Sequence, residues 1–304
     1  SINASTGAID LDASTMGTYA VKYVTSSSVC ADSTTFNVTL TATNTVSVNG
    51  AYDISTATFV QNFSVQSQEI APQGITFNND GTKMFIVGSN GDDINEYSLS
   101  TAFDVSTASY VQVFSVQSQE LTPMSVVFNN NGTKMYVLGR SGDDVNEYSL
   151  STAFDISSAS YTQVFSVAAQ EVFASGMAFN NDGTKMFVVG HSGDDVNEYS
   201  LSTAFDISSA SYTQVFSVAA QEVNPNGMAF NNDGTKMFVV GQSGDDVNEY
   251  NLSTAFDIST ASFVQLFSVA GQETVPSGVQ FNNDGSKMFI IGNSSDNVFE
   301  YSLD

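Results

Sequence analysis

A repeat of 51 residues is the feature that most constrains how this 304-residue chain can fold. The run Asp80-Gly81-Thr82-Lys83-Met84 returns, nearly unchanged, from Asn131, Asp182, Asp233 and Asp284, and no copy has an insertion or a deletion. A fixed period of this length is typical of architectures in which each repeat is one supersecondary unit. The sequence therefore predicts five equivalent structural units.

Each copy contains four segments with strand character. In the second copy they are Ser125–Asn130, Lys134–Gly139, Asp144–Leu150 and Tyr161–Val167. Asn131-Gly132 predicts a tight turn between the first two segments, because both residue types tolerate positive φ. No segment has helical periodicity, and four strands per repeat of this length is the signature of a propeller blade. The predicted fold is all-β, a five-bladed β-propeller of four-stranded blades over residues 49–304.

The ends of the repeat region predict how the propeller closes. Thr58–Val65 corresponds to a fourth strand that precedes the first complete blade, whereas Val298–Asp304 corresponds to a third strand with no fourth strand after it. Pairing these two segments in one blade would close the ring and remove an exposed sheet edge. We therefore expect the N-terminal strand to complete the last blade.

The repeat resembles the YVTN/TolB-like propeller family. Blades of that family carry the pattern F-x-x-D-G-x-K-hydrophobic, which here is Phe77-Asn78-Asn79-Asp80-Gly81-Thr82-Lys83-Met84 and its repeats. The resemblance covers residues 50–304. It implies an architecture and transfers no activity, because one fold hosts many functions.

Residues 1–48 share no repeat with the rest of the chain. Gly17–Val24 and Thr35–Thr41 alternate apolar and polar residues, which predicts two paired strands with one buried face. The apolar positions are Tyr19, Val21, Tyr23, Phe36, Val38 and Leu40. Together with Ile2–Asp10, the segment resembles the C-terminal half of Ig-like surface domains of the Bacteroidetes type. That resemblance implies a partial Ig-like β-sandwich, in which Cys30 lacks a partner that the earlier half of the domain would provide.

A sheet with one uncovered apolar face is not stable alone. Two explanations stay open: the missing strands belong to a segment that the sequence does not include, or a neighbouring molecule supplies a strand. In the second case Cys30 and the six apolar residues of the two strands would form the intermolecular contact. A head-to-tail contact of that kind does not close on itself and would generate a filament.

The charge of the chain restricts its partners. Lys and Arg number 7 against 32 Asp and Glu, which gives a formal net charge of −25. This excess disfavours nucleic acid and anionic membranes, and no apolar run approaches the roughly 18 residues of a membrane span. An acidic, lysine-poor surface suits an extracellular or cell-surface location. The start Ser1-Ile2-Asn3 shows no signal peptide, so we expect any such segment to have been removed.

Differences between the copies gather in two loop series on one predicted face of the disc. The loop before the first strand contains all four prolines, at Pro72, Pro123, Pro225 and Pro276. The loop after the second strand varies at one position, and variable loops on a rigid scaffold are common binding surfaces. The variable residues are Ser89, Arg140, His191, Gln242 and Asn293. Drift in unconstrained loops is the alternative explanation.

Acidic pairs are expected on the same face. Asp92, Asp143, Asp194 and Asp245 are included in the candidate ligand-binding surface, and the residues that follow them, Asp93, Asp144, Asp195 and Asp246, are weak candidates for Ca²⁺. Solvated turn residues are the competing interpretation. No other cofactor is predicted, because one histidine and one cysteine do not make a zinc site.

The sequence gives no sign of catalysis. Glycoside hydrolysis needs two carboxylates in different environments, whereas Glu96, Glu147, Glu198, Glu249 and Glu300 are equivalent by repeat. We therefore expect a non-enzymatic protein. Six candidate glycosylation sequons occur at a frequency expected by chance, at Asn3, Asn37, Asn62, Asn131, Asn251 and Asn293.

Two functions follow from these observations. The first is a secreted structural or surface protein, a subunit of an extracellular filament or an adhesin that assembles head to tail into a homopolymer by strand complementation. The second is a lectin-like propeller that binds glycans at near-equivalent sites, one per blade, and so recognises a repetitive ligand.

Overall fold

The computed structural model describes residues 17–24, 33–40 and 51–303. The chain divides into two units, Ser1–Val48 and Asn49–Asp304. In the first unit, β1 (Gly17–Val24) pairs antiparallel with β2 (Ser33–Leu40), and Tyr19 lies opposite Val38. This confirms the predicted strand pair, although β2 begins two residues earlier than expected. Cys30 and the rest of the predicted partial Ig-like sandwich lie outside the described residues.

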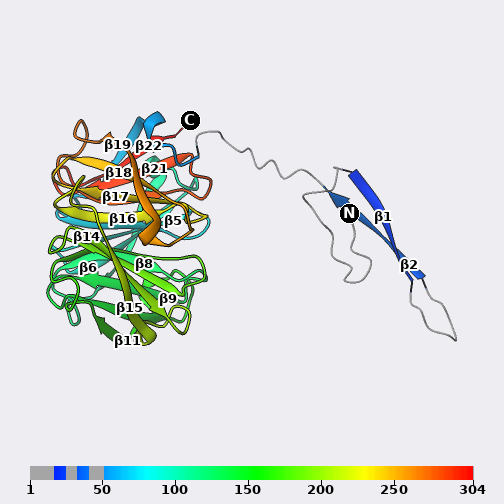
Figure 1. Ribbon diagram of the computed structural model, residues 1–304, viewed down its shortest axis with the longest axis horizontal. Helices are drawn as coiled ribbons and strands as arrows, with labels where there is room; N and C mark the ends of the chain where they lie inside the picture. Colours follow the sequence, from blue (N-terminus) through cyan, green and yellow to red (C-terminus); the bar gives the residue numbers. More distant parts are fainter. Residues whose placement is uncertain (1–16, 25–32, 41–50, 304) are drawn as a thin grey trace. The chain divides into compact units, whose positions relative to one another are not determined.

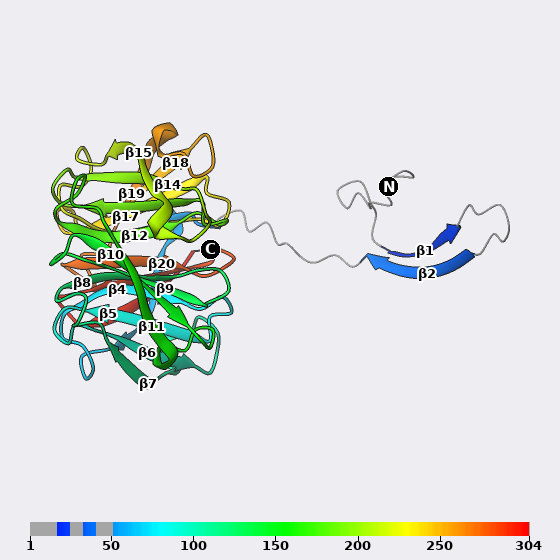
Figure 2. The same ribbon diagram turned by 90° about the horizontal axis from the view of Figure 1, so that it is seen from below.

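The second unit is a five-bladed β-propeller of four-stranded antiparallel sheets (Figures 1 and 2). Within each blade the strand order follows the chain. The first blade has β4 (Pro72–Phe77), β5 (Lys83–Gly88), β6 (Asp93–Leu99) and β7 (Ala108–Ser115). The second has β8 (Pro123–Phe128), β9 (Lys134–Gly139), β10 (Asp144–Leu150) and β11 (Ala159–Ser166). The third has β12 (Ala174–Phe179), β13 (Lys185–Gly190), β14 (Asp195–Leu201) and β15 (Ala210–Ser217). The fourth has β16 (Pro225–Phe230), β17 (Lys236–Gly241), β18 (Asp246–Leu252) and β19 (Ala261–Ser268).

The fifth blade closes the ring as predicted. It contains β20 (Pro276–Phe281), β21 (Lys287–Gly292) and β22 (Asn297–Ser302), and its outer strand is β3 (Thr58–Ser64). β3 and β22 run antiparallel, with Ser64 opposite Asn297 and Thr58 opposite Ser302. The chain segment before the first complete blade therefore completes the last one.

Two boundaries differ from the sequence-based prediction. The first strand of the second blade is Pro123–Phe128 rather than Ser125–Asn130, because proline can occupy the first position of a strand and the two asparagines belong to the turn. The linker after the third strand holds a short 3₁₀ helix that periodicity did not reveal. Each one begins after an aspartate whose side chain accepts a backbone N–H, as Asp155 does from Ser157. The helices are η1 (Ile54–Thr56), η2 (Val105–Thr107), η3 (Ile156–Ser158), η4 (Ile207–Ser209) and η5 (Ile258–Thr260).

The innermost strands approach one another closely around the central channel. A Cβ atom on Gly227 would lie 2.8 Å from the backbone oxygen of Ser277 in the next blade, so only glycine fits there. Side chains also join neighbouring blades at this level. Ser175 Oγ donates to Pro225 O over 2.8 Å, and Asn226 Nδ2 donates to Pro276 O over 2.9 Å. The propeller is therefore narrowest near the first residues of its innermost strands.

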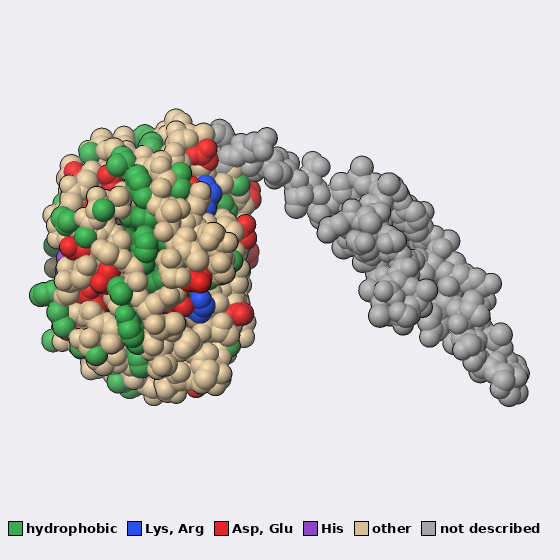
Figure 3. Space-filling view, viewed as in Figure 1, with side chains coloured by type: hydrophobic (Ala, Val, Ile, Leu, Met, Phe, Trp, Pro, Cys, Tyr) green, Lys and Arg blue, Asp and Glu red, His purple; other side chains and the backbone are tan. Residues whose placement is uncertain are grey.

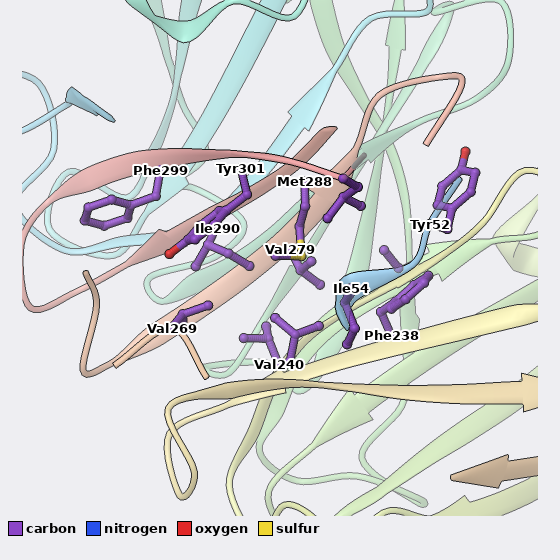
Figure 4. Packing of buried hydrophobic residues seen from close by; sticks show 13 residues of the cluster. Tyr52, Ile54, Phe238, Val240, Val269, Val279, Met288, Ile290, Phe299 and Tyr301 are labelled. Atoms are coloured by element: carbon purple, nitrogen blue, oxygen red, sulfur yellow. The ribbon is translucent and has the colours of Figure 1, made fainter. Parts of the chain in front are cut away.

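The hydrophobic core lies between adjacent blades. Figure 4 shows one such cluster, in which Phe238 and Val240 of the fourth blade pack near Met288 and Ile290 of the fifth. Burying each of these side chains is worth about 1.5–3 kcal/mol. Tyr52 extends the cluster to the turn at Gly285, where φ is +70° and a Cβ atom would overlap the tyrosine ring. The aromatic residue before each 3₁₀ helix thus covers the turn of a blade.

Candidate functional site

The two variable loop series lie on one face of the propeller, as predicted. Ser89 N donates to Ala71 O over 3.2 Å, and the same pair of loops is joined in every other blade. The Asn-Asp-Gly turns connect the first and second strands at the opposite ends of those strands. We call the first surface the variable face and the second the turn face.

Arg140, His191 and Asn226 form a contact chain across three consecutive blades on the variable face. Asn226 Nδ2 donates to Pro276 O, so its side-chain oxygen is left for His191 Nε2, 2.8 Å away. Arg140 Nη2 lies 3.1 Å from His191 Nε2 and 3.5 Å from Nδ1, so the arginine contacts the edge of the ring that also faces Asn226. Burial and the neighbouring Arg140 charge both lower the pKa of His191, which keeps the ring neutral. The chain thus joins residues that differ between repeats.

Arg140 differs from the lysines of the propeller. Its guanidinium makes no ion pair within 4.0 Å in the described residues, and its buried Nε has no hydrogen-bond partner there. Burial lowers its pKa, although Glu171 and Asp143 lie near enough to oppose that effect. Arg140 is therefore a half-buried cation whose Nε–H makes no hydrogen bond to the described residues.

The other predicted residues of the variable series do not join this chain. Ser89 Oγ accepts from Gln73 Nε2 at 3.2 Å, Gln242 is exposed, and Asn293 is half-buried in its loop. The structure brings Arg140 and His191 together and leaves these three apart. Each of the three follows the second strand of its own blade and makes no contact with Arg140 or His191 among the described hydrogen bonds.

Exposed apolar side chains accompany the polar chain on the variable face. Ile70, Leu121, Val172 and Val223 occupy equivalent positions just before the innermost strands, and each is about half exposed, as is Phe173. The sequence analysis did not identify this set. An apolar residue that recurs every 51 residues, just before the loop with the prolines, could have indicated it. The remaining exposed large apolar residues lie on the outer strands β3, β7, β11, β15 and β19, where apolar side chains form a stripe along the rim (Figure 3).

The first aspartate of each pair is a turn residue, and the second begins the third strand of its blade. Asp92 and its equivalents have φ near +50°, a conformation that aspartate tolerates in turns. Asp93 Oδ1 accepts from Asn95 Nδ2 at 2.7 Å, and the same bond recurs at Asp144, Asp195 and Asp246. Burial, with a contribution from Glu69, raises the pKa of Asp93 to about 6, and burial with Glu120 does the same for Asp144. Among the described residues no group of three acidic, histidine or cysteine ligands could hold a metal ion, so these candidates for Ca²⁺ are not brought together.

A buried glutamate supports each variable loop. Glu69 Oε1 accepts from Ala71 N at 2.7 Å and from Asn90 N at 3.3 Å, and its carboxylate occupies the space where Gly88 has no Cβ. The equivalents are Glu120, Glu171, Glu222 and Glu273. Sequence analysis did not single them out, because a glutamate in an apolar loop carries no local signature of a backbone-binding role.

The repeated glutamates considered for catalysis are engaged in ion pairs. Glu96 is about 2% exposed, and its Oε1 lies 2.7 Å from Lys83 Nζ. Lys83 Nζ also donates to Phe154 O of the next blade, and Gln112 Nε2 bridges Glu96 Oε2 and Asp155 Oδ1. The other four blades repeat the Lys–Glu pair at 2.5–3.0 Å. These carboxylates therefore join neighbouring blades.

A hollow opens at the mouth of the channel on the turn face. One cavity of about 210 Å³ and a second of about 170 Å³ share Thr76, Phe77, Asn79, Phe230, Asn232 and Gln280 in their walls. Five asparagines surround the mouth in a closed ring, in which each side-chain Nδ2 donates to the backbone oxygen of the next member. They are Asn79, Asn130, Asn181, Asn232 and Asn283. The predicted binding face is the opposite one, so this hollow is a site that sequence reasoning missed.

The candidate glycosylation sites are distributed over both units. Asn62 on β3, Asn131 in a turn and Asn251 on β18 are exposed, whereas Asn293 is half-buried. Asn37 lies on β2 opposite Ala20, and Asn3 falls outside the described residues. No helix in the described ranges is long and apolar enough to cross a membrane.

Comparisons with known proteins find similarity to solved structures alone. No family model and no curated protein matches the sequence. Solved structures similar to it include a putative 6-phosphogluconolactonase from Bacteroides uniformis, at 12% identity over 76% of this chain and 67% of that one, with a TM-score of 0.48. A periplasmic gluconolactonase from Pseudomonas aeruginosa is 15% identical over 77% and 66%, with a TM-score of 0.47. A luciferin-regenerating enzyme is 10% identical over 80% and 95%, with a TM-score of 0.49.

These structures correct one expectation. Sequence analysis predicted that the chain is not an enzyme, because its acidic residues are equivalent by repeat. Several structures similar to it carry enzyme titles, so the prediction that this chain is not an enzyme is withdrawn. Identities of this size show the fold alone, and they assign no reaction to this chain.

Proposed function

We propose that this protein is an extracellular adhesive binding module that docks a partner protein on its variable face. The observation that carries the proposal is the set of exposed apolar residues, Ile70, Leu121, Val172, Phe173 and Val223, on the face that also holds Arg140. Aromatic and arginine side chains in an apolar surround are typical of the energetic centres of protein interfaces. The aspartate turns on the same face favour a partner with a basic rim.

The repeats supply matched variants to test this proposal. The loops around Arg140, His191 and Gln242 are otherwise identical, so R140Q and H191Q install the residue that the fourth blade already carries. F173N likewise installs the fourth-blade residue, Asn224. Immobilised wild-type protein should retain envelope proteins of the producing cell that the triple variant R140Q/H191Q/F173N does not retain. Equal retention by both proteins would disprove docking at this face.

A second candidate function is assembly into a filament. It is favoured by the sheet β1–β2, which has two strands among the described residues, because a pair of strands is marginally stable and gains from an added strand. Strand complementation by a neighbouring molecule would then join copies head to tail. Negative-stain microscopy tests this, and monomers at all concentrations would contradict it.

We also infer two family relationships. The recurring F-x-x-D-G-x-K pattern supports membership of the repeats in the YVTN/TolB-like propellers. The alternating residues of β1 and β2 support the Ig-like origin of the first unit. Profiles built from homologues of each unit would test both inferences.

A further inference from the structure

The hollow at the turn face has an unusual chemical character for this chain. The walls of the two cavities together contain phenylalanine, tyrosine, methionine, valine, alanine, asparagine, threonine and glutamine, and no described charged residue lines either one. The whole protein nevertheless carries a formal charge of −25. An uncharged pocket in so acidic a molecule selects against ions and favours a neutral ligand.

The hollow is asymmetric, although the blades that build it are repeats. At one equivalent position of the innermost strands, Val127, Ala178 and Ala229 make an apolar side. The same position is Thr76 in the first blade and Gln280 in the fifth, which are adjacent in the ring. Hydrogen-bonding groups thus gather on one side of the channel and apolar groups on the other.

The ring of asparagines adds acceptors at the mouth. Each side-chain nitrogen is used in the ring, whereas the five side-chain oxygens accept no hydrogen bond from the described residues. These asparagines are exposed, so their oxygens are available to hydroxyl donors. The aromatic residues below them offer apolar surface.

We propose that this hollow binds one neutral pyranose unit, at the end of a glycan or free in solution. A pyranose has hydroxyls that both donate and accept, and C–H faces that pack on apolar surface, which matches the two sides of the channel. A cavity of roughly 150 Å³ can hold a six-membered ring such as benzene, so one of about 210 Å³ has room for a single pyranose. The site lies on the face opposite the proposed docking surface, and the two proposals are independent.

Isothermal titration with glucose, galactose, mannose and N-acetylglucosamine tests the proposal, with glucuronic acid as the charged comparison. T76A and Q280A install the alanine that the third and fourth blades carry at this position, so they remove the polar side without disturbing the fold. T213V on the outer strand β15 is the control, because Val111 and Val264 are its equivalents. Melting temperatures verify that each variant folds.

At least one neutral sugar should bind the wild-type protein and T213V equally, and T76A/Q280A should weaken it at least tenfold. Glucuronic acid should bind more weakly than its neutral counterpart. Absence of binding to all four neutral sugars, tighter binding of glucuronic acid, or unchanged affinity in T76A/Q280A would each overturn the proposal. None of these results depends on whether the variable face docks a protein.

Discussion

Individual residues of this protein can be judged against four internal homologues in the same molecule. Asp144 has an aspartate at its equivalent position in three other blades, but the fifth blade has Asn297 there. Lys134 has a lysine in every blade, and each one pairs with a buried glutamate. A position that varies shows which substitution the fold accepts, whereas a position that never varies indicates which interaction joins the blades.

We expect the propeller to lose stability as the pH rises from about 4 to about 6. The folded-state pKa of Asp93 and of Asp144 is about 6, above the usual 3.8 of an aspartate, so the folded state binds more protons in this window. The double variant D93N/D144N should therefore melt at a higher temperature than wild type at pH 7.5 and show a flatter pH profile. Thermal melts at pH 5 and 7.5 measure both effects.

The control for that prediction is D80N. Asp80 is exposed, its pKa is lowered by hydrogen bonds from Thr82, and the second blade has Asn131 at this place. D80N should leave the profile between pH 5 and 7.5 unchanged. An equally steep profile in D93N/D144N would show that these carboxyls are not its origin.

K134M should be strongly destabilising. It leaves Glu147 buried without its cation, and breaking such a pair from one side costs about 3–5 kcal/mol. K134M/E147Q should recover part of that loss, because the remaining group is neutral. Urea unfolding measures both variants, and a loss below about 1 kcal/mol for K134M would contradict this account of the ion pair.

At the scale of elements, sequence periodicity predicted most of what the structure contains. The second and third strands of the second blade, Lys134–Gly139 and Asp144–Leu150, were predicted with their observed bounds. Turn glycines and a strict 51-residue period located them. The 3₁₀ helices escaped prediction, because a single turn is too short to show periodicity and depends on an aspartate cap.

The candidate sites were less predictable than the strands. Arg140 and His191 were singled out because they differ between repeats, but their contact depends on Asn226 in a third blade. The hollow on the turn face arises from residues that are mostly invariant, and a search for variation overlooks such residues. Its asymmetry, from Thr76 and Gln280, becomes visible only once those strands are neighbours around a channel.

Deleting residues 51–66 should destabilise the whole propeller. The deletion removes β3, η1 and Tyr52, which leaves β22 as an exposed edge and the fifth blade without part of its core. A synthetic peptide of residues 51–66, added to the truncated protein, should raise its melting temperature again. A truncated protein as stable as the full chain would contradict closure by this strand.

At the scale of the whole molecule, charge is the dominant feature. The five lysines of the propeller are engaged in ion pairs with buried glutamates. Most carboxylates at the surface therefore have no positively charged side chain nearby. Self-repulsion of this kind disfavours the compact state. Arg140 and His191 are the remaining basic side chains of the propeller, and both lie on the variable face.

The melting temperature should therefore rise with salt. The Debye length falls from about 30 Å at 0.01 M to about 8 Å at 0.15 M ionic strength, which screens the surface repulsion more than the buried pairs. Scanning calorimetry in NaCl at both concentrations measures the effect. Calcium chloride at matched ionic strength should act like NaCl, and a larger shift that a chelator reverses would identify a specific calcium site.

The way in which the ring closes has a mechanical consequence. Thr58, where the chain enters β3, lies opposite Ser302, where it leaves β22, so both ends of the propeller chain emerge at the same end of one strand pair. Tension between them would load that end first and peel the hydrogen bonds apart one after another, instead of shearing them together. A load carried through one attachment point would spare this seam. Tension between these two points should therefore open the propeller at low force.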